Sequence, residues 1–194
     1  MKNRRSEFLE QIQELGLATE IQSVKDVKVD KDDPVQVRLA GKRHMESVLE
    51  IENRSFNVPW DEPKFLQYVQ KRNHIFKVVE SRRGLVYGFI IYELAEGKIR
   101  IVNLAVAPEV RRTGIGSMIV EELKDRASPN KRPIIEVYLL ERNIQAQLFF
   151  SSLGFRAVSQ KRAEDICYDE DLYLFQYSLV HQGVNRISRY FKET

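Results

Sequence analysis

The spacing of apolar residues divides the chain into a central part and two flanking segments. Between residues 34 and 179, short apolar runs alternate between the two-residue period of strands and the period of helices. Residues 1–33 carry one short helix signal followed by the charged stretch VKDVKVDKDDP, which we interpret as a linker. Residues 180–194 mix apolar and basic positions, a pattern that predicts a basic amphipathic helix.

Within the central part, the pattern predicts an α/β (α+β) domain. Alternating positions predict strands at residues 35–39, 74–80, 85–93, 98–106, 134–140, 157–162 and 171–179. Helical spacing predicts helices at residues 45–52, 61–69, 115–127 and 143–153, with Asp61 as the cap of the second. Gly84 and Gly97 lie in the turns that separate the second, third and fourth strands. We therefore expect these three strands to form an antiparallel meander.

Composition is typical of a folded domain and excludes several classes of protein. Hydrophobic residues make up 43% and charged residues 30%, which excludes a disordered or collagen-like chain. No apolar run approaches the roughly 20 residues that span a bilayer, and the start MKNRRSEFLEQ lacks the apolar core of a secretory signal. The net charge of +3 permits anionic ligands without indicating a DNA-binding protein.

The few cysteine and histidine residues predict neither a disulfide nor a metal site. Cys167 is the one cysteine, so an intramolecular disulfide framework is excluded and a cytoplasmic location is the simplest interpretation. No histidine is near Cys167 in sequence, which favours a packing role over that of an acyl-carrying nucleophile. His44, His74 and His181 lie far apart without the spacing of metal ligands, and we expect surface or packing roles for them.

The clearest chemical signal is the segment VNLAVAPEVRRTGIGSMIVEEL, residues 102–123, in which the run Arg111-Arg112-Thr113-Gly114-Ile115-Gly116 opens a helix. The unpaired N–H groups and partial positive charge of a helix N-terminus suit a phosphate. Glycines let the backbone approach a pyrophosphate closely, and arginines add cationic donors. The segment lacks the GK[ST] of a P-loop, and Ile119 replaces the third small residue of a dinucleotide fingerprint. Taken alone, the glycine pair is equally compatible with a tight turn.

A second segment, IIEVYLLERNIQAQLFFSSLGFRAV (residues 134–158), consists of a strand, Asn143, a helix and a Gly-Phe turn. Together the two segments resemble the GNAT superfamily of N-acetyltransferases. The R-x-x-G-x-G run is similar to its acetyl-CoA pyrophosphate loop, and the Asn-to-Gly-Phe run is similar to its second cofactor motif. A third piece, IENRSFNVPWDEPKF (residues 51–65), resembles the substrate side of the bacterial ribosomal-protein-alanine N-acetyltransferase branch.

The resemblance implies a GNAT fold over residues 34–179, with a mixed central sheet of about six to seven strands, a splayed central pair and about four flanking helices. Residues 1–33 and 180–194 lie outside it. The exposed backbone of one splayed strand would pair with the pantetheine arm of acetyl-CoA. The cofactor-binding residues that the resemblance implies are Leu104, Ala105, Val106, Arg111, Arg112, Thr113, Gly114, Ile115, Gly116, Ser117 and Asn143. No metal is implied, and Trp60 would line the edge of the acceptor groove.

The chain departs from the family at both positions that the alanine-acetyltransferase branch uses for catalysis. The position of the general base, a glutamate in that branch, is occupied by Tyr138, counted back from Asn143. The position of the general acid, a tyrosine in that branch, is occupied by Phe150. Glu136 and Glu141 are nearby in sequence, but neither falls on the family position. Losing a general acid or base typically costs about 10²–10⁴-fold in rate.

A site without a strong base favours an amine of low pKa. An α-amino group has a reference pKa of about 7.7–8.0, so part of it is neutral near pH 7, whereas a lysine amine with a pKa of about 10.4 costs roughly 3.5 kcal/mol more to deprotonate. The sequence therefore predicts transfer from acetyl-CoA to a primary amine, with the N-terminus of a ribosomal or other protein as the expected acceptor. A small-molecule amine acetyltransferase and a catalytically degenerate acyl-CoA-binding protein remain as alternatives. We expect a monomer or a homodimer.

Overall fold

The computed structural model describes residues 33–162 and 170–179. The helices expected in residues 1–33 and 180–194, as well as Cys167 and His181, therefore fall outside the described residues. The strands are β1 (Val35–Leu39), β2 (His74–Ser81), β3 (Val86–Ala95), β4 (Lys98–Val106), β5 (Ile134–Leu140), β6 (Arg156–Lys161) and β7 (Leu172–Ser178). The α-helices are α2 (Met45–Ser55), α3 (Glu62–Val69), α4 (Ile115–Arg126) and α5 (Ile144–Ser152). Each strand and helix predicted for residues 34–179 is thus present, with its ends shifted by a few residues at most.

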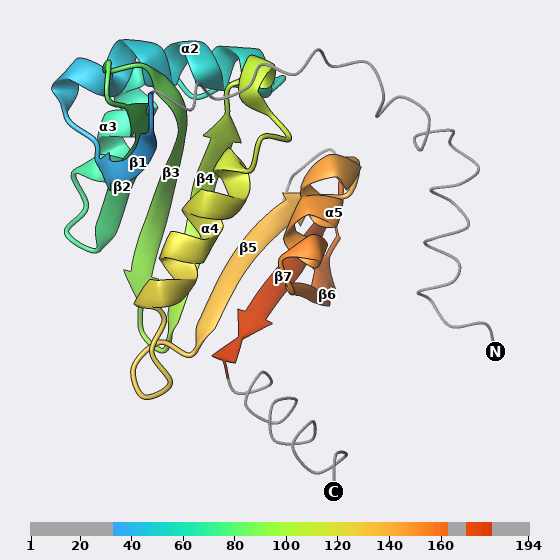
Figure 1. Ribbon diagram of the computed structural model, residues 1–194. Coiled ribbons are helices and arrows are strands. Elements are labelled where there is room, and N and C mark those ends of the chain that lie inside the picture. The colour runs from blue at the N-terminus through green and yellow to red at the C-terminus, as the bar shows by residue number, and fades with distance from the viewer. Residues whose placement is uncertain (1–32, 163–169, 180–194) are drawn as a thin grey trace, which may run out of the picture.

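The strands form one seven-stranded mixed sheet in the order β1-β2-β3-β4-β5-β7-β6 (Figure 1). Strands β2, β3 and β4 make the antiparallel meander that the sequence predicts. Strands β4 and β5 are the one parallel pair among the described strands, joined by the crossover through α4. Strand β7 inserts between β5 and β6, so the last strand in sequence is not the last in the sheet.

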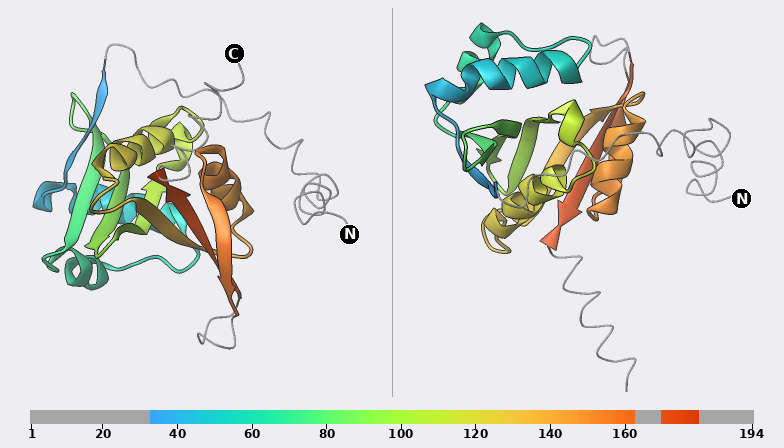
Figure 2. Two further views of the ribbon diagram at one scale, coloured as in Figure 1. Left: turned by 90° about the horizontal axis from the view of Figure 1, so that it is seen from below. Right: turned by 45° about the horizontal axis from the view of Figure 1, so that its top comes forward.

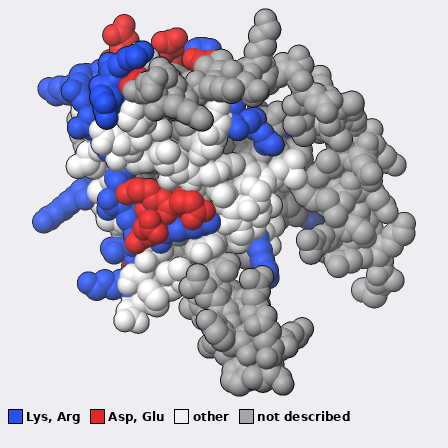
Figure 3. Space-filling model, in the orientation of Figure 1, with Lys and Arg blue, Asp and Glu red and all other residues white. Residues whose placement is uncertain are grey.

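The helices cover both faces of the sheet, α4 and α5 on one and α2 and α3 on the other (Figure 2). On the α3 face, the ring of Phe65 packs edge-on against that of Phe89 with 5.6 Å between centroids. Figure 3 shows acidic and basic side chains side by side over α4, where Glu121 pairs with Lys124 and Glu122 with Arg126. Within the described residues, no helix is long and apolar enough to cross a membrane.

The centre of the sheet splays open between β4 and β5. Their pairing begins at Lys98 with Ile134 and ends at Ile101 with Val137, after which the two strands diverge. A β-bulge marks this point, because Ile101 pairs with Tyr92 and Asn103 with Ile91, so Val102 is left out of the register. The splayed central pair that the family resemblance implied is therefore confirmed, and the β5-facing backbone of residues 102–106 has no strand partner there.

Candidate active site

The loop before α4 presents free backbone donors. Arg112 has a φ of 68° and Gly114, the N-cap of α4, a φ of 95°, so the chain makes two left-handed steps before the helix begins. The N–H groups of residues 112–117 donate to no acceptor in the described part of the chain. A Cβ built on Gly114 would meet no atom within 4 Å. The loop therefore has the free donors and the open space that a pyrophosphate needs.

The second glycine of the motif has a packing role as well. A Cβ at Gly116 would lie 3.1 Å from the ring of Phe149 on α5, closer than ordinary van der Waals contact. A side chain at Gly116 would therefore require the Phe149 ring to shift, so this glycine favours the close packing of α4 against α5. The two glycines that the sequence analysis treated alike thus differ: Gly114 borders open space, and Gly116 borders another helix.

The two arginines of the motif are also placed differently. The Arg111 guanidinium donates to the carbonyl of Val106 over 3.0 Å and to the hydroxyl of Ser55 over 2.9 Å, which ties the end of β4 to α2. Arg112 is exposed and forms no hydrogen bond or ion pair with another described residue. A phosphate contact from Arg112 would therefore break no existing contact, whereas one from Arg111 would compete with its role as a brace.

Asn143 lies where β5 turns into α5. Its side-chain Oδ1 accepts a hydrogen bond from the backbone N–H of Ala146 over 3.1 Å, so the residue is the N-cap of α5. At the other end of this helix, Gly154 adopts a φ of 85° and closes the motif. The contact of Asn143 with the cofactor arm stays a prediction, and helix capping is a second role for its side chain.

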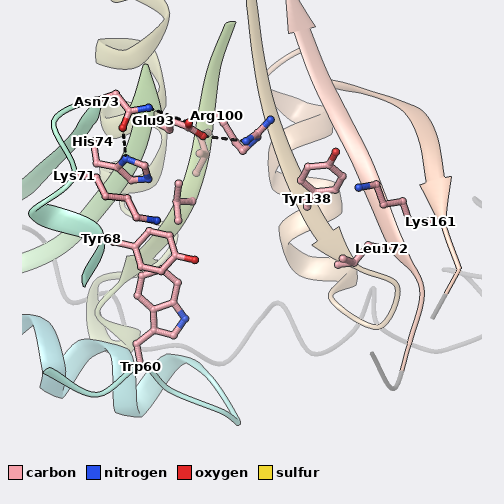
Figure 4. Close-up of a pocket in the computed structure, with 12 residues that line it drawn as sticks. Trp60, Tyr68, Lys71, Asn73, His74, Glu93, Arg100, Tyr138, Lys161 and Leu172 are labelled. Carbon is pink, nitrogen blue, oxygen red and sulfur yellow. Dashed lines mark hydrogen bonds and ion pairs between the residues drawn. The ribbon is translucent and has the colours of Figure 1, made fainter. Parts of the chain in front are cut away.

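A cavity of about 730 Å³ lies at the divergence of β4 and β5, on the face that α3 covers. Figure 4 shows its two walls, one from α3 and the meander strands and one from β5, β6 and β7. The lining residues are Trp60, Tyr68, Lys71, Asn73, His74, Glu93, Arg100, Ile101, Val102, Tyr138, Lys161 and Leu172. Trp60 and Tyr138, singled out from the sequence, thus lie in one cavity, whereas Phe150 is not among its lining residues.

The Trp60 side of the cavity is built around a buried carboxyl group. Glu52 on α2 is 1% exposed and accepts hydrogen bonds from the backbone N–H of Trp60 over 2.9 Å and from Asn103 over 3.1 Å. Burial raises the pKa of Glu52, and these two hydrogen bonds only partly oppose the rise. Trp60 in turn stacks on Tyr68, with 4.5 Å between the ring centroids. Through these two hydrogen bonds, Glu52 links the loop that carries Trp60 to Asn103 on β4.

An ion cluster holds the closed end of the splay. Glu136 on β5 is 1% exposed and pairs with Arg100 over 2.8 Å and with Lys98 over 3.0 Å, both on β4. Arg100 also pairs with Glu93 on β3 over 2.9 Å. Burial raises the pKa of Glu136, but the hydrogen bonds from Lys98 and Arg100 outweigh burial, so the pKa of this carboxyl group lies below its ordinary value. Glu136 is therefore held as an anion by two cations and is poorly suited to accept a proton from an amine.

The two positions that the family resemblance leads us to expect as catalytic, Tyr138 and Phe150, have different surroundings. Tyr138 lines the cavity, and the Lys161 ammonium lies 4.9 Å from the centroid of its ring. Phe150 is 3% exposed and packs edge-on between Phe149 and Phe155, each at 5.1 Å. Glu141 is exposed and does not line the cavity. The base position thus offers a hydroxyl, and the acid position offers no polar atom.

Several lining residues were not singled out from the sequence, namely Tyr68, Lys71, Glu93, Arg100 and Lys161. Tyr68 on α3 and Lys71 just after it are close to Trp60 in sequence and could have been found from that segment, whereas Glu93, Arg100 and Lys161 are brought to the cavity by strand pairing. His74, expected at the surface or in packing, lines the cavity, and burial lowers its pKa. Among the described residues, no group of His, Cys, Asp and Glu side chains could hold a metal ion.

Comparison with known proteins agrees with this geometry. Residues 72–157 match the acetyltransferase (GNAT) domain. Over 114 residues the chain is 29% identical to the [ribosomal protein bS18]-alanine N-acetyltransferase of Escherichia coli, covering 58% of this chain and 74% of that protein.

Solved structures share the fold. The crystal structure of the Escherichia coli ribosomal-protein-S18-alanine N-acetyltransferase superposes with a TM-score of 0.66 at 20% identity, covering 75% of this chain and 94% of that one. Arabidopsis thaliana NAA60 in complex with acetyl-CoA superposes with a TM-score of 0.66 at 16% identity, covering 75% and 99%. The sequence motifs, the splayed sheet and the family match over residues 72–157 agree that the chain contains an acetyltransferase (GNAT) domain.

Proposed function

We propose that this acetyltransferase uses acetyl-CoA to acetylate the α-amino group of a protein N-terminus. The observation that carries the proposal is the divergence of β4 from β5, with the free N–H groups before α4 on one face of the sheet and the cavity on the opposite face. An acyl donor held on one face could thereby reach an amine held on the other. The similarity to the Escherichia coli enzyme named above, a ribosomal-protein-alanine N-acetyltransferase, supports a protein acceptor.

The chain's own groups suit the two halves of acetyl-CoA. The backbone N–H groups of residues 112–117, with Arg112 beside them, would hold the pyrophosphate. The β5-facing backbone of Leu104, Ala105 and Val106, which has no strand partner, would hold the pantetheine arm as an added strand. Asn143, at the start of α5, would lie beside that arm. These roles depend mainly on backbone, which is why the side chains of β4 can remain those of a core strand.

The reaction forms a bond between the acceptor nitrogen and the acetyl carbonyl carbon, breaks the thioester C–S bond, and transfers the amine proton to the CoA sulfur in net terms. The chain contributes mainly by positioning the two reactants. Tyr138 is the hydroxyl at the family base position and lines the cavity, so we assign it to the path by which the amine proton leaves. With Glu136 paired and Phe150 apolar, a low-pKa α-amino group fits the site better than a lysine amine.

One observation favours a second candidate, a protein that binds acyl-CoA without efficient turnover. The acid position is filled by Phe150 inside an aromatic cluster, so no protein donor for the leaving thiolate is evident there. Without that donor, transfer would be slow. The cytoplasmic location and the oligomeric state expected from the sequence remain predictions.

The deciding experiment incubates the full chain with acetyl-CoA and three sets of acceptors: peptides with free N-termini, polyamines and aminoglycosides. Products are read by mass spectrometry, and acetyl-CoA binding is measured separately by calorimetry. A mass gain of one acetyl group on peptide α-amino groups supports the proposal. Acetylation of the small amines alone would contradict it, and binding without transfer to any acceptor would favour the second candidate.

A further inference from the structure

The cavity walls carry two lysines that have no carboxylate partner. The side-chain ammonium groups of Lys71, just after α3, and Lys161, at the end of β6, form no ion pair or hydrogen bond with another described residue. Each ammonium instead lies against an aromatic ring, that of Lys71 at 4.4 Å from Tyr68 and that of Lys161 at 4.9 Å from Tyr138. Figure 4 shows them on opposite walls, separated by the opening between β4 and β5.

The other charged groups of the cavity already neutralise one another. Glu93, the one carboxylate among the lining residues, pairs with Arg100 and accepts a hydrogen bond from Asn73 over 3.0 Å. Arg100 is shared between Glu93 and Glu136. Burial also lowers the pKa of His74, so the cavity gains no further positive charge from it near neutral pH. The charge left over in the walls is therefore that of Lys71 and Lys161.

A third lysine extends this pattern along the aromatic wall. The Lys64 ammonium lies 4.9 Å from the centroid of the Trp60 ring, on the same helix that leads to Lys71. An aromatic face is a weak partner for an ammonium at an exposed position, and it leaves the remaining N–H donors unused. A carboxylate would offer each lysine a charge-assisted hydrogen bond without displacing an existing ion pair.

We infer that the acceptor of this enzyme carries a carboxylate close to its amine, as a peptide with an acidic first or second residue does. The inference rests on the proposed function and narrows it to one class of N-terminus. With the amine at the opening between β4 and β5, the next side chains would pass between Lys71 and Lys161. Both lysines are exposed at the rim, so their contribution is moderate and sensitive to salt.

The test compares peptides that differ only in Asp against Asn, or Glu against Gln, at the first two positions, with the full chain and acetyl-CoA at low salt. We expect kcat/KM to be about fivefold higher for the acidic member of each pair, and this preference to shrink as salt is added. Lys71→Gln and Lys161→Gln should each lower the preference about twofold, and Lys71→Glu with Lys161→Glu should reverse it in favour of a Lys-containing peptide.

Lys131→Gln is the matched control, because Lys131 is exposed in the loop between α4 and β5 and does not line the cavity. Lys131→Gln should keep the full preference for acidic peptides. The affinity for acetyl-CoA should stay unchanged in all variants. Free glutamate, tested alongside, distinguishes a small acidic amine from a peptide. Equal rates for the acidic and amide peptides, or a preference that survives charge reversal, would overturn the inference while leaving N-terminal acetylation intact. If no peptide is acetylated, calorimetric binding of the same pairs in the presence of CoA decides the question, and equal affinities overturn it.

Discussion

The two sides of this active site are built from different parts of the chain. On the α4 face, the loop before α4 and the open edge of β4 offer mainly backbone N–H and C=O groups. On the α3 face, the cavity is lined by residues from seven helices and strands and from the two loops that flank α3, and its net charge depends on which charged side chains form ion pairs. The first side is suited to a constant ligand, since the backbone is the same for every residue. The second side can vary with a few substitutions, and it carries Tyr138, one of the two positions at which the family resemblance implies a departure.

This difference would let the proposed enzyme function without the two catalytic side chains that the family resemblance leads one to expect. Replacing a glutamate by Tyr138 or a tyrosine by Phe150 alters side chains, but the strand divergence and the free N–H groups persist. Holding two reactants in the correct geometry can by itself give a large increase in rate, and here the backbone would do most of the holding. The difference between the two faces predicts that substitutions in the loop before α4 abolish acetyl-CoA binding. Substitutions on the side-chain-built parts of the site should instead alter the transfer rate, the stability or the preference among acceptors.

The largest effect should come from Gly114→Val. At a φ of 95°, a β-branched residue is strained, and its side chain would enter the open space beside the free N–H groups. Loss of the hydrogen bonds to a charged phosphate should weaken acetyl-CoA binding about 100-fold, as measured by calorimetry. Gly97→Val is the matched control, since Gly97 has a φ of 70° and similar open space in the β3–β4 turn. An equal loss of affinity in both variants would contradict a phosphate role for the loop.

Glu136→Gln should test the ion cluster at the closed end of the splay. Removing the anion leaves Lys98 and Arg100 without their shared partner, so unfolding free energy should fall by about 2–3 kcal/mol near pH 7. Because the pKa of Glu136 is lowered on folding from its ordinary 4.5, its contribution is present above that pH and is lost as the pH falls through the folded value. The gap between wild type and variant should therefore narrow in acid, as followed by denaturant unfolding.

The exposed Glu141 provides the control for that measurement. Glu141→Gln should leave the free energy of unfolding unchanged both near pH 7 and in acid. Acetyl-CoA affinity should be unaffected by Glu136→Gln, since the cluster lies on the opposite face from the loop. A stability difference between wild type and Glu136→Gln that widens in acid would contradict a stabilising role for the Glu136 anion. A loss of acetyl-CoA binding in the folded variant would contradict the separation of the ion cluster from the loop before α4.

Phe150→Tyr should restore a donor at the acid position of the related branch. We expect the single-turnover rate at saturating acetyl-CoA to rise about tenfold. The hydroxyl enters a packed aromatic cluster, so stability should fall by about 1–2 kcal/mol. Phe155→Tyr adds the same hydroxyl to the same cluster and should cost stability without raising the rate. A rate that does not change, with binding intact, would show that water or another group protonates the thiolate.

The smallest effect should follow removal of residues 1–32. Acetyl-CoA affinity should stay within about twofold, because the charged linker offers little apolar surface to bury. The shortened chain should keep Asp33, which is 3% exposed and accepts a hydrogen bond from the backbone N–H of Arg83 over 3.2 Å. Calorimetry measures the affinity, and transfer assays run in parallel. Normal affinity with lost transfer would place this segment at the acceptor side.

Sequence reasoning was strongest where local rules decide the structure. Alternation and glycine turns predicted the meander, and Asp61 caps α3 through the N–H of Lys64, as expected. The splay could be predicted only through the family resemblance, because the loss of strand pairing has no local signature. The cluster around Glu136 was not predicted, since it depends on the register that places Arg100 opposite it. The insertion of β7 beside β5 likewise depends on long-range pairing.

The divergence of β4 from β5 also makes β4 a strand of two kinds along its length. Before Ile101 it is an interior strand with neighbours on both sides, and beyond that point it is an edge strand enclosed within the molecule. Amide hydrogen exchange should record this change, with slow exchange throughout residues 98–101 and fast exchange at those amides of residues 102–106 that point toward β5. Filling the opening with a strand-like ligand would slow these amides selectively, so the exchange rates of this one strand would report whether the site is occupied.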